Sequence, residues 1–222
     1  TSFGYTGNIG GRFFYQFYPL QFNVVRLFDL DQSFFNTLSR DPFMRNAYQD
    51  HFDLGSGATF YYTTNADVVP RTPFFYVRFQ ADIAGNILSA FKPLMKKDSG
   101  GAGIIWNTPF SQYVRGELSV GRTWRFGRKD GQALATRFLV GAGYAYGNST
   151  ALPFEKHFYA GGASSLRGWQ ARAVGPGLSP LDRTFIIANQ TGDMKLEANL
   201  EYRFKMFWKV DGAVFLDAGN VW

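Results

Sequence analysis

Hydrophobic and polar residues alternate with a period of two along most of this chain. Eight stretches show the pattern: 2–6, 13–28, 52–65, 75–88, 112–126, 134–146, 194–206 and 210–222. The alternation is most regular in 194–206, where apolar residues (Met194, Leu196, Ala198, Leu200, Tyr202, Phe204, Met206) oppose polar ones (Lys195, Glu197, Asn199, Glu201, Arg203, Lys205). Because successive side chains of a strand point to opposite faces, the pattern predicts about eight strands, each with an apolar and a polar face. Pro19, inside the second stretch, predicts a bulge or a local break in its pairing.

The connections between these stretches alternate between short and long. Turns are expected near 7–11, 66–73, 127–132 and 207–209, and long loops at 29–51, 91–111 and 147–192. Asp31 and Asp41-Pro42 predict one or two short helices in the first long loop. Short turns at one end and long loops at the other are typical of outer-membrane barrels, and stretches of ten or more residues can cross a bilayer as tilted strands. We therefore predict an all-β, antiparallel transmembrane β-barrel with long external loops. The alternative is a soluble antiparallel barrel with its polar face outward.

Composition agrees with this fold class. The 222 residues include 24 Phe and 12 Tyr, yet the mean hydropathy is only −0.18 and no run of 18 apolar residues occurs. In a barrel the apolar residues occupy alternate positions and escape hydropathy averages. The chain has no cysteine, which excludes disulfides and thiolate metal sites. Its net charge of +6 is not gathered into a basic run, so we expect no nucleic-acid partner. Lys96-Lys97 could contact lipopolysaccharide phosphates or form a solvated loop tip.

The third long loop carries an unusual segment, Gly161-Gly162-Ala163-Ser164-Ser165-Leu166-Arg167-Gly168-Trp169, followed by Gly175-Pro176-Gly177. Glycine permits positive φ and close backbone approach. The single arginine offers a planar fork of donors that suits carboxylates. The segment could therefore be a loop docked on acidic residues, or a flexible surface loop with an incidental arginine.

With its flanking residues, this segment resembles the signature sixth external loop of BamA/TamA-type outer-membrane assembly factors, a family of bacterial surface antigen barrels. The resemblance rests on Phe158-Tyr159-Ala160-Gly161-Gly162, Ser165-Leu166-Arg167-Gly168-Trp169 and Gly175-Pro176-Gly177, in that order. Leu200-Glu201-Tyr202 and Phe215-Leu216-Asp217-Ala218-Gly219-Asn220-Val221-Trp222 resemble the next two strands of that family. Tyr48-Gln49-Asp50-His51-Phe52 is similar to the TamA-like branch found in Bacteroidetes.

The resemblance implies a sixteen-stranded barrel preceded by periplasmic POTRA domains. Residues 1–222 would then form part of one barrel domain, with 2–6 ending the sixth strand and 210–222 forming the thirteenth. The early strands, the closing strands and the POTRA domains would lie outside this chain. The alternative is a complete eight-stranded barrel that ends on Trp222.

The resemblance also implies a site. In the family this loop folds into the lumen and its arginine meets acidic residues of the inner wall; here those residues would be Arg167, Glu201 and Asp217. Gly161, Gly162 and Gly168 would allow close contact, and the remaining motif residues are Leu166, Trp169, Gly175, Pro176 and Gly177. The alternation independently places Glu201 on a polar face. Without the loop motif, Glu201 and Asp217 would be expected to line the lumen without a partner.

The function implied is non-enzymatic assembly, insertion or translocation of proteins at the bacterial outer membrane. The expected partners are unfolded outer-membrane or surface proteins, outer-membrane lipids, lipopolysaccharide and accessory subunits, with no cofactor and no metal site. A porin or transport channel is the alternative. An enzyme would need a nucleophile beside His51 or His157, and neither histidine has one at a recognisable spacing.

Overall fold

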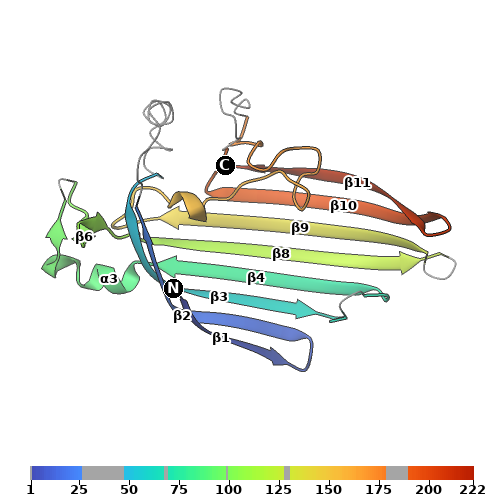
Figure 1. The fold of residues 1–222 in the computed structure, drawn as a ribbon, viewed down its shortest axis with the longest axis horizontal. Helices are drawn as coiled ribbons and strands as arrows, with labels where there is room; N and C mark the ends of the chain where they lie inside the picture. Colours follow the sequence, from blue (N-terminus) through green and yellow to red (C-terminus); the bar gives the residue numbers. More distant parts are fainter. Residues whose placement is uncertain (1, 27–47, 68–69, 99, 128–130, 179–189) are drawn as a thin grey trace.

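The computed structural model describes residues 2–26, 48–67, 70–98, 100–127, 131–178 and 190–222. The helices expected around 31–48 fall almost entirely outside these ranges. Eight strands form one antiparallel sheet in the order β1-β2-β3-β4-β8-β9-β10-β11, each paired with its neighbour along the sheet (Figure 1). Their bounds are β1 Ser2–Ile9, β2 Phe13–Val25, β3 His51–Thr63, β4 Phe74–Ala84, β8 Tyr113–Phe126, β9 Gln132–Ala145, β10 Met194–Phe207 and β11 Val210–Val221. The predicted all-β, antiparallel fold class is confirmed.

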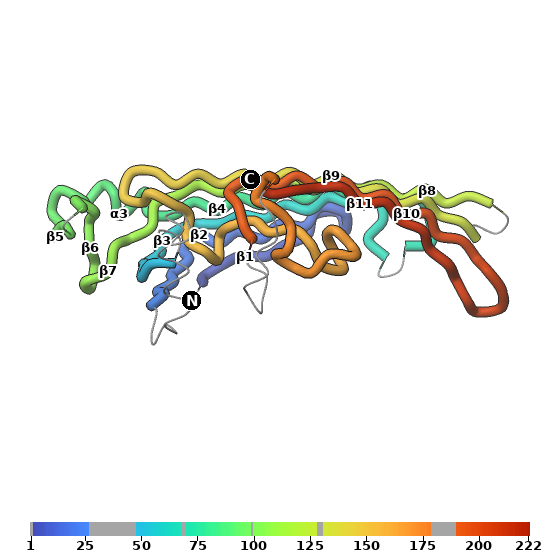
Figure 2. The backbone as a smooth tube through the Cα atoms, turned by 90° about the horizontal axis from the view of Figure 1, so that it is seen from above, coloured from blue at the N-terminus to red at the C-terminus, as the bar shows by residue number. Residues whose placement is uncertain are grey.

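The sheet is an up-and-down meander whose two ends differ. The connections β1–β2, β3–β4, β8–β9 and β10–β11 are short and lie at one end, while the long connections β2–β3, β4–β8 and β9–β10 lie at the other (Figure 1). Within the described residues β1 and β11 are the edges of the sheet, so the sheet is open. Figure 2 shows that the sheet curls and that the chain between β9 and β10 crosses one of its faces.

Burial across the sheet is the reverse of that in a soluble protein. On β10 the apolar residues Met194 and Leu196 are 53% and 41% exposed, whereas the intervening polar face carries Glu197, which is 1% exposed. Neighbouring strands repeat this arrangement, with Phe138 exposed on β9 and Ser119 buried on β8. A lipid-facing apolar surface and a packed polar interior account for this pattern. None of the described helices is long and apolar enough to cross a bilayer.

Two local features of the strands bear on the sequence prediction. The expected bulge or local break at Pro19 is confirmed, because the pairing of β2 with β3 shifts register between Tyr18 and Gln21. The prediction that one strand covers 75–88 was wrong at its end, since β4 stops at Ala84. Gly85 follows with φ 79°, and a Cβ there would lie 2.3 Å from the carbonyl oxygen of Ser111. Only glycine fits this turn.

The chain after Gly85 forms a small structure of its own at the long-loop end. A short helix α3 (Asn86–Ala90) leads into the 3-10 helix η1 (Lys92–Leu94). A three-stranded sheet follows, made of β5 (Lys96–Lys97), β6 (Gly103–Ile105) and β7 (Thr108–Pro109). The loop expected at 91–111 therefore has secondary structure that alternation alone did not show.

Candidate functional site

The connection between β9 and β10 folds back over the polar face of the sheet. It includes the 3-10 helix η3 (Phe154–Lys156) and then runs across β9, β10 and β11. Two glycines of β9 make room for it, because a Cβ at Gly141 would lie 2.4 Å from the Phe158 ring and one at Gly143 2.5 Å from Leu152. Phe158 and Leu166 form a buried cluster with Val221 of β11. The connection is thus packed against the wall of the sheet by apolar contacts as well as polar ones.

The tip of this connection is a compact hairpin. The Gly162 amide donates to the Trp169 carbonyl at 2.9 Å, and the Arg172 amide donates to the Ala160 carbonyl at 3.0 Å. Gly161 has φ 101°, and a Cβ there would lie 2.0 Å from the carbonyl oxygen of Gln170. Glycine at this position is therefore required for the two arms of the hairpin to approach each other.

Arg167 lies at the turn of the hairpin and reaches the two predicted acidic residues. Its Nε donates to Oδ2 of Asp217 at 2.8 Å and its Nη2 donates to Oδ1 at 2.7 Å. Its Nη1 donates to Oε2 of Glu201. The guanidinium carbon lies 3.9 Å from the centre of the Phe215 ring, which adds a cation–π contact. The structure therefore brings Arg167, Glu201 and Asp217 together.

The pairing of β10 with β11 explains why both carboxylates face one arginine. Glu201 pairs with Phe215 and Asn199 pairs with Asp217, so the two acids are diagonal neighbours on one face of the sheet. The Asn199 amide donates to Asp217 Oδ1 and to the Ser165 carbonyl, both at 2.8 Å. The Asp217 side chain is only 4% exposed, so its charge is compensated by hydrogen bonds rather than by bulk water.

The rest of the motif divides into packed and exposed residues. Leu166 is buried, but Trp169 is 56% exposed and a Cβ at Gly168 would meet nothing within 4 Å. The Gly175-Pro176 peptide bond is cis, and the Gly177 amide donates to the Val221 carbonyl at 2.8 Å. The Gly-Pro-Gly segment therefore docks on the end of β11, whereas Trp169 does not contribute to the buried contact.

A second polar contact holds the hairpin, and the sequence did not single it out. Glu197, fully buried on β10, accepts a hydrogen bond from the Ser165 hydroxyl and forms ion pairs with Arg137 at 3.2 Å and Lys195 at 3.0 Å. Arg137 also donates to the Ser164 carbonyl at 2.6 Å. Alternation in the sequence indicates that Arg137 of β9 and Glu197 of β10 share a polar face. It does not indicate which residues of that face contact the loop.

The two histidines lie in different surroundings. His157 is buried in the connection, with its Nδ1 3.1 Å from the Thr191 hydroxyl, and burial lowers its pKa to about 4. Thr191 is buried as well, so this pair braces the loop and offers no accessible nucleophile. His51, at the start of β3, contacts Glu155 of η3.

Comparison with known proteins gives the family. A family model described as the Omp85 superfamily domain matches residues 110–222. The outer membrane protein assembly factor BamA of Neisseria meningitidis serogroup B (strain MC58) is 30% identical over 106 residues, which are 46% of this chain and 13% of that protein. The crystal structure of BamA from Haemophilus ducreyi lacking POTRA domains 1-3 shares 14% identity with a TM-score of 0.38, over 95% of this chain and 46% of that chain.

The antiparallel sheet, with one exposed apolar face and a loop packed on its polar face, is that of an outer-membrane β-barrel protein. The chain belongs to the Omp85 superfamily, and its location is the bacterial outer membrane. It spans 13% of the length of the curated relative that it matches.

Proposed function

We propose that this chain is the loop-bearing part of a non-enzymatic factor that assembles, inserts or translocates proteins at the outer membrane. Membership of the Omp85 superfamily and the likeness to an outer membrane protein assembly factor support this proposal. Its clients are unfolded outer-membrane or surface proteins, and its surroundings are outer-membrane lipids and lipopolysaccharide. We also propose that it works with accessory subunits and that it belongs to the TamA-like branch of the family.

The observation that carries the proposal is the docking of Arg167 on Asp217 and Glu201. The loop 158–177 would lie inside the lumen of the complete barrel, held to the inner wall by this contact. A passive channel needs an open lumen, which a long loop fixed across its interior would narrow. An insertion factor needs a barrel whose wall is held in a defined arrangement while clients pass, and a charge-assisted lock between loop and wall supplies that.

We further propose that the eight strands are part of a sixteen-stranded barrel preceded by POTRA domains. The intact mass of the native polypeptide tests this point, because a value well above the 25.0 kDa of these residues is expected. A mass near 25.0 kDa would contradict it.

The functional test is replacement of Arg167 by alanine in the chromosomal copy of the gene, with the protein kept at its normal level. We expect folded outer-membrane proteins to decline and unfolded ones to accumulate in the periplasm. Arg78→Ala is the matched control, because Arg78 is an exposed arginine of β4 that donates a hydrogen bond to Gln80 at 3.4 Å. Normal assembly in the Arg167→Ala strain, together with large steady conductance of the purified protein in planar bilayers, would favour the channel instead.

A further inference from the structure

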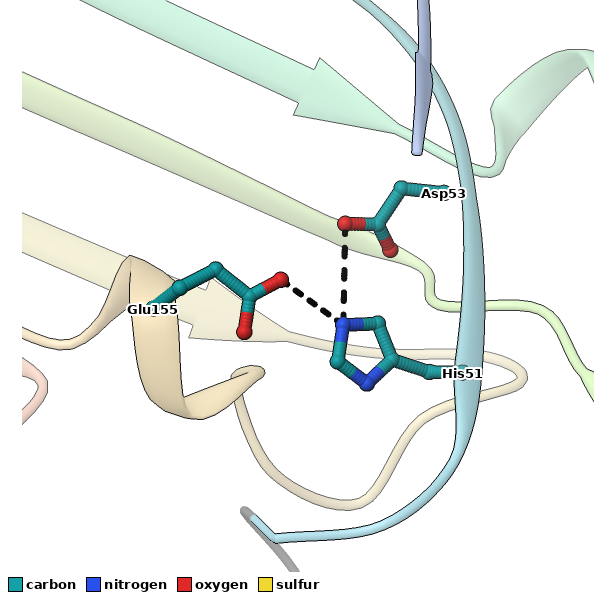
Figure 3. Close-up of side chains that lie close together, drawn as sticks. All are labelled: His51, Asp53 and Glu155. Carbon is teal, nitrogen blue, oxygen red and sulfur yellow. Dashed lines mark hydrogen bonds and ion pairs between the residues drawn. The ribbon is translucent and has the colours of Figure 1, made fainter. Parts of the chain in front are cut away.

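A second cluster of ionisable side chains lies at the long-loop end of the sheet, away from Arg167. It consists of His51 and Asp53 of β3 and Glu155 of η3 (Figure 3). Their nitrogen and oxygen ligand atoms all lie within 4.8 Å of one another. Because Glu155 is 104 residues from His51, no sequence spacing reveals the cluster.

The orientation of His51 is fixed by the backbone. Its Nδ1 lies 2.8 Å from the Gln49 carbonyl oxygen, which can only accept, so Nδ1 carries the proton. This arrangement directs Nε2 toward the carboxylates, at 2.7 Å from Glu155 Oε1 and 3.9 Å from Asp53 Oδ2. A histidine that ligates a metal typically donates its other ring N–H to such a carbonyl. The Nε2 lone pair and the two carboxylates are all electron-rich, so a proton or a metal cation must lie between them.

A proton on Nε2 would not satisfy the whole cluster. It would serve Glu155, but the Asp53 side chain is 7% exposed and neither of its oxygens has a hydrogen bond within the described part of the chain. Ser111 lies near the carboxylate without forming an ordinary hydrogen bond to it. Burial of a carboxylate without compensation is costly. A divalent cation would neutralise both carboxylates and occupy the imidazole lone pair together.

We propose that His51, Asp53 and Glu155 bind a divalent transition-metal ion, with Zn²⁺ the best match. Imidazole nitrogen with carboxylate oxygens is a donor set of zinc sites, whereas Ca²⁺ and Mg²⁺ prefer oxygen ligands alone. Tetrahedral ligands at about 2.0–2.1 Å from zinc lie roughly 3.3 Å apart. The distances of 2.7 and 3.9 Å lie on either side of this value, so small side-chain movements would complete the site.

The surroundings allow an ion to enter and give it a structural role. Asp53 lines a cavity on the polar face together with Asp82, Tyr113 and Lys156. A bound ion would join η3, in the β9–β10 connection, to the start of β3. It would therefore fasten the outer end of the same connection whose tip is held by Arg167, by a contact independent of that arginine.

The test is metal binding by the full-length protein, folded in detergent, freed of metal by chelation and without a histidine tag. We expect stoichiometric Zn²⁺ binding by calorimetry and, with Co²⁺ as a probe, the intense visible absorption of a tetrahedral site. Zinc should also raise the unfolding temperature. Asp53→Asn, His51→Gln and Glu155→Gln should each lower affinity by at least about tenfold.

Two variants serve as controls. Glu117→Gln removes another carboxylate of the polar face, which lies on β8 and pairs with Arg115 at 3.3 Å. His157→Gln removes the other histidine of the chain. Both should bind Zn²⁺ as the unmodified protein does.

Failure of the unmodified protein to bind Zn²⁺ stoichiometrically would overturn the proposal, and so would loss of binding only in His157→Gln. If the variants of His51 and Asp53 do not fold, Glu155→Gln alone tests the site. The Glu155 side chain is 35% exposed and lies outside the sheet, so this variant should fold. A folded Glu155→Gln protein with unchanged Zn²⁺ affinity would also contradict the site.

Discussion

Arg167 and Asp217 meet through two hydrogen bonds, Nε to Oδ2 at 2.8 Å and Nη2 to Oδ1 at 2.7 Å. The Arg167 backbone amide adds a third bond to Oδ2 at 3.0 Å. This fork-to-fork geometry is specific to a guanidinium facing a carboxylate, and an ammonium cannot reproduce it. The contact depends on shape as well as charge, so conservative and drastic substitutions of Arg167 should both weaken it.

We expect Arg167→Ala to lower the free energy of unfolding by roughly 2–3 kcal/mol, somewhat less than for a fully buried pair. The reason is that Asp217, 4% exposed, would keep its charge without its main partner. Arg167→Lys should lose more than half of this amount. Denaturant unfolding of the protein in detergent measures both, with Arg78→Ala as the control on the same polar face. A loss no greater than that of the control would show that the arginine does not hold the loop.

The second loop contact should behave as a buried ion cluster. Glu197→Gln keeps the shape of the side chain but leaves Arg137 and Lys195 without their common carboxylate. We expect a loss of roughly 3–5 kcal/mol. Ser165→Ala should cost about 1–3 kcal/mol, because Glu197 retains its cations and loses one donor.

The same unfolding measurement tests this cluster. Glu117→Gln is its control, since Glu117 is 22% exposed and forms an ion pair with Arg115 at 3.3 Å. That substitution should cost less than Glu197→Gln, because Arg115 keeps Asp82 and the Lys156 carbonyl as partners. Equal losses of unfolding free energy for Glu117→Gln and Glu197→Gln would contradict a particular role of Glu197 in holding the loop.

Alternation predicted the strands and their faces because a strand has a period of two whatever lies beside it. The bounds expected at 194–206 and 210–222 differ by only one residue from β10 and β11. The end of β4 was missed because its apolar pattern continues through Ile87, and only the close approach of Ser111 to Gly85 breaks the strand. That approach depends on a neighbouring chain segment, which a local pattern does not contain.

Partners within the site were harder to predict than faces. The pairing of Arg167 with Glu201 and Asp217 came from the family resemblance, and its functional role stays a prediction. Glu197 and Arg137 are 60 residues apart, and many charged residues share their face, so charge complementarity alone did not select them. Their meeting is set by strand register and by the path of the loop.

Glycines on the inner wall should be as important as the charged residues. Gly141→Val would place a side chain against the Phe158 ring, whose nearest atom lies 2.4 Å from the position of the new Cβ. We expect the β9–β10 connection to be displaced and to become sensitive to added protease in the folded protein. Gly116→Val is the matched control, because its Cβ would have no neighbour closer than 3.9 Å and valine favours strands. Equal protease resistance of both variants would contradict the close packing.

His157 should make the protein less stable in acid. Burial lowers its pKa to about 4, from an ordinary value near 6.5 when unfolded. Between these values the unfolded chain binds more protons than the folded one, so stability falls as the pH decreases from about 6.5 to about 4. The contribution lost over this range is at most about 3 kcal/mol, because Asp193 Oδ1 lies 3.6 Å from Nε2 and favours the protonated imidazole.

Unfolding measured from neutral to acid pH checks this expectation. His157→Gln should flatten the slope that His157 contributes over this interval, whereas Arg78→Ala should retain it. The slope arises from a neutral imidazole held away from water beside Thr191, and glutamine has no group that titrates there. An unchanged pH dependence in His157→Gln would show that His157 does not contribute to the acid sensitivity of the protein.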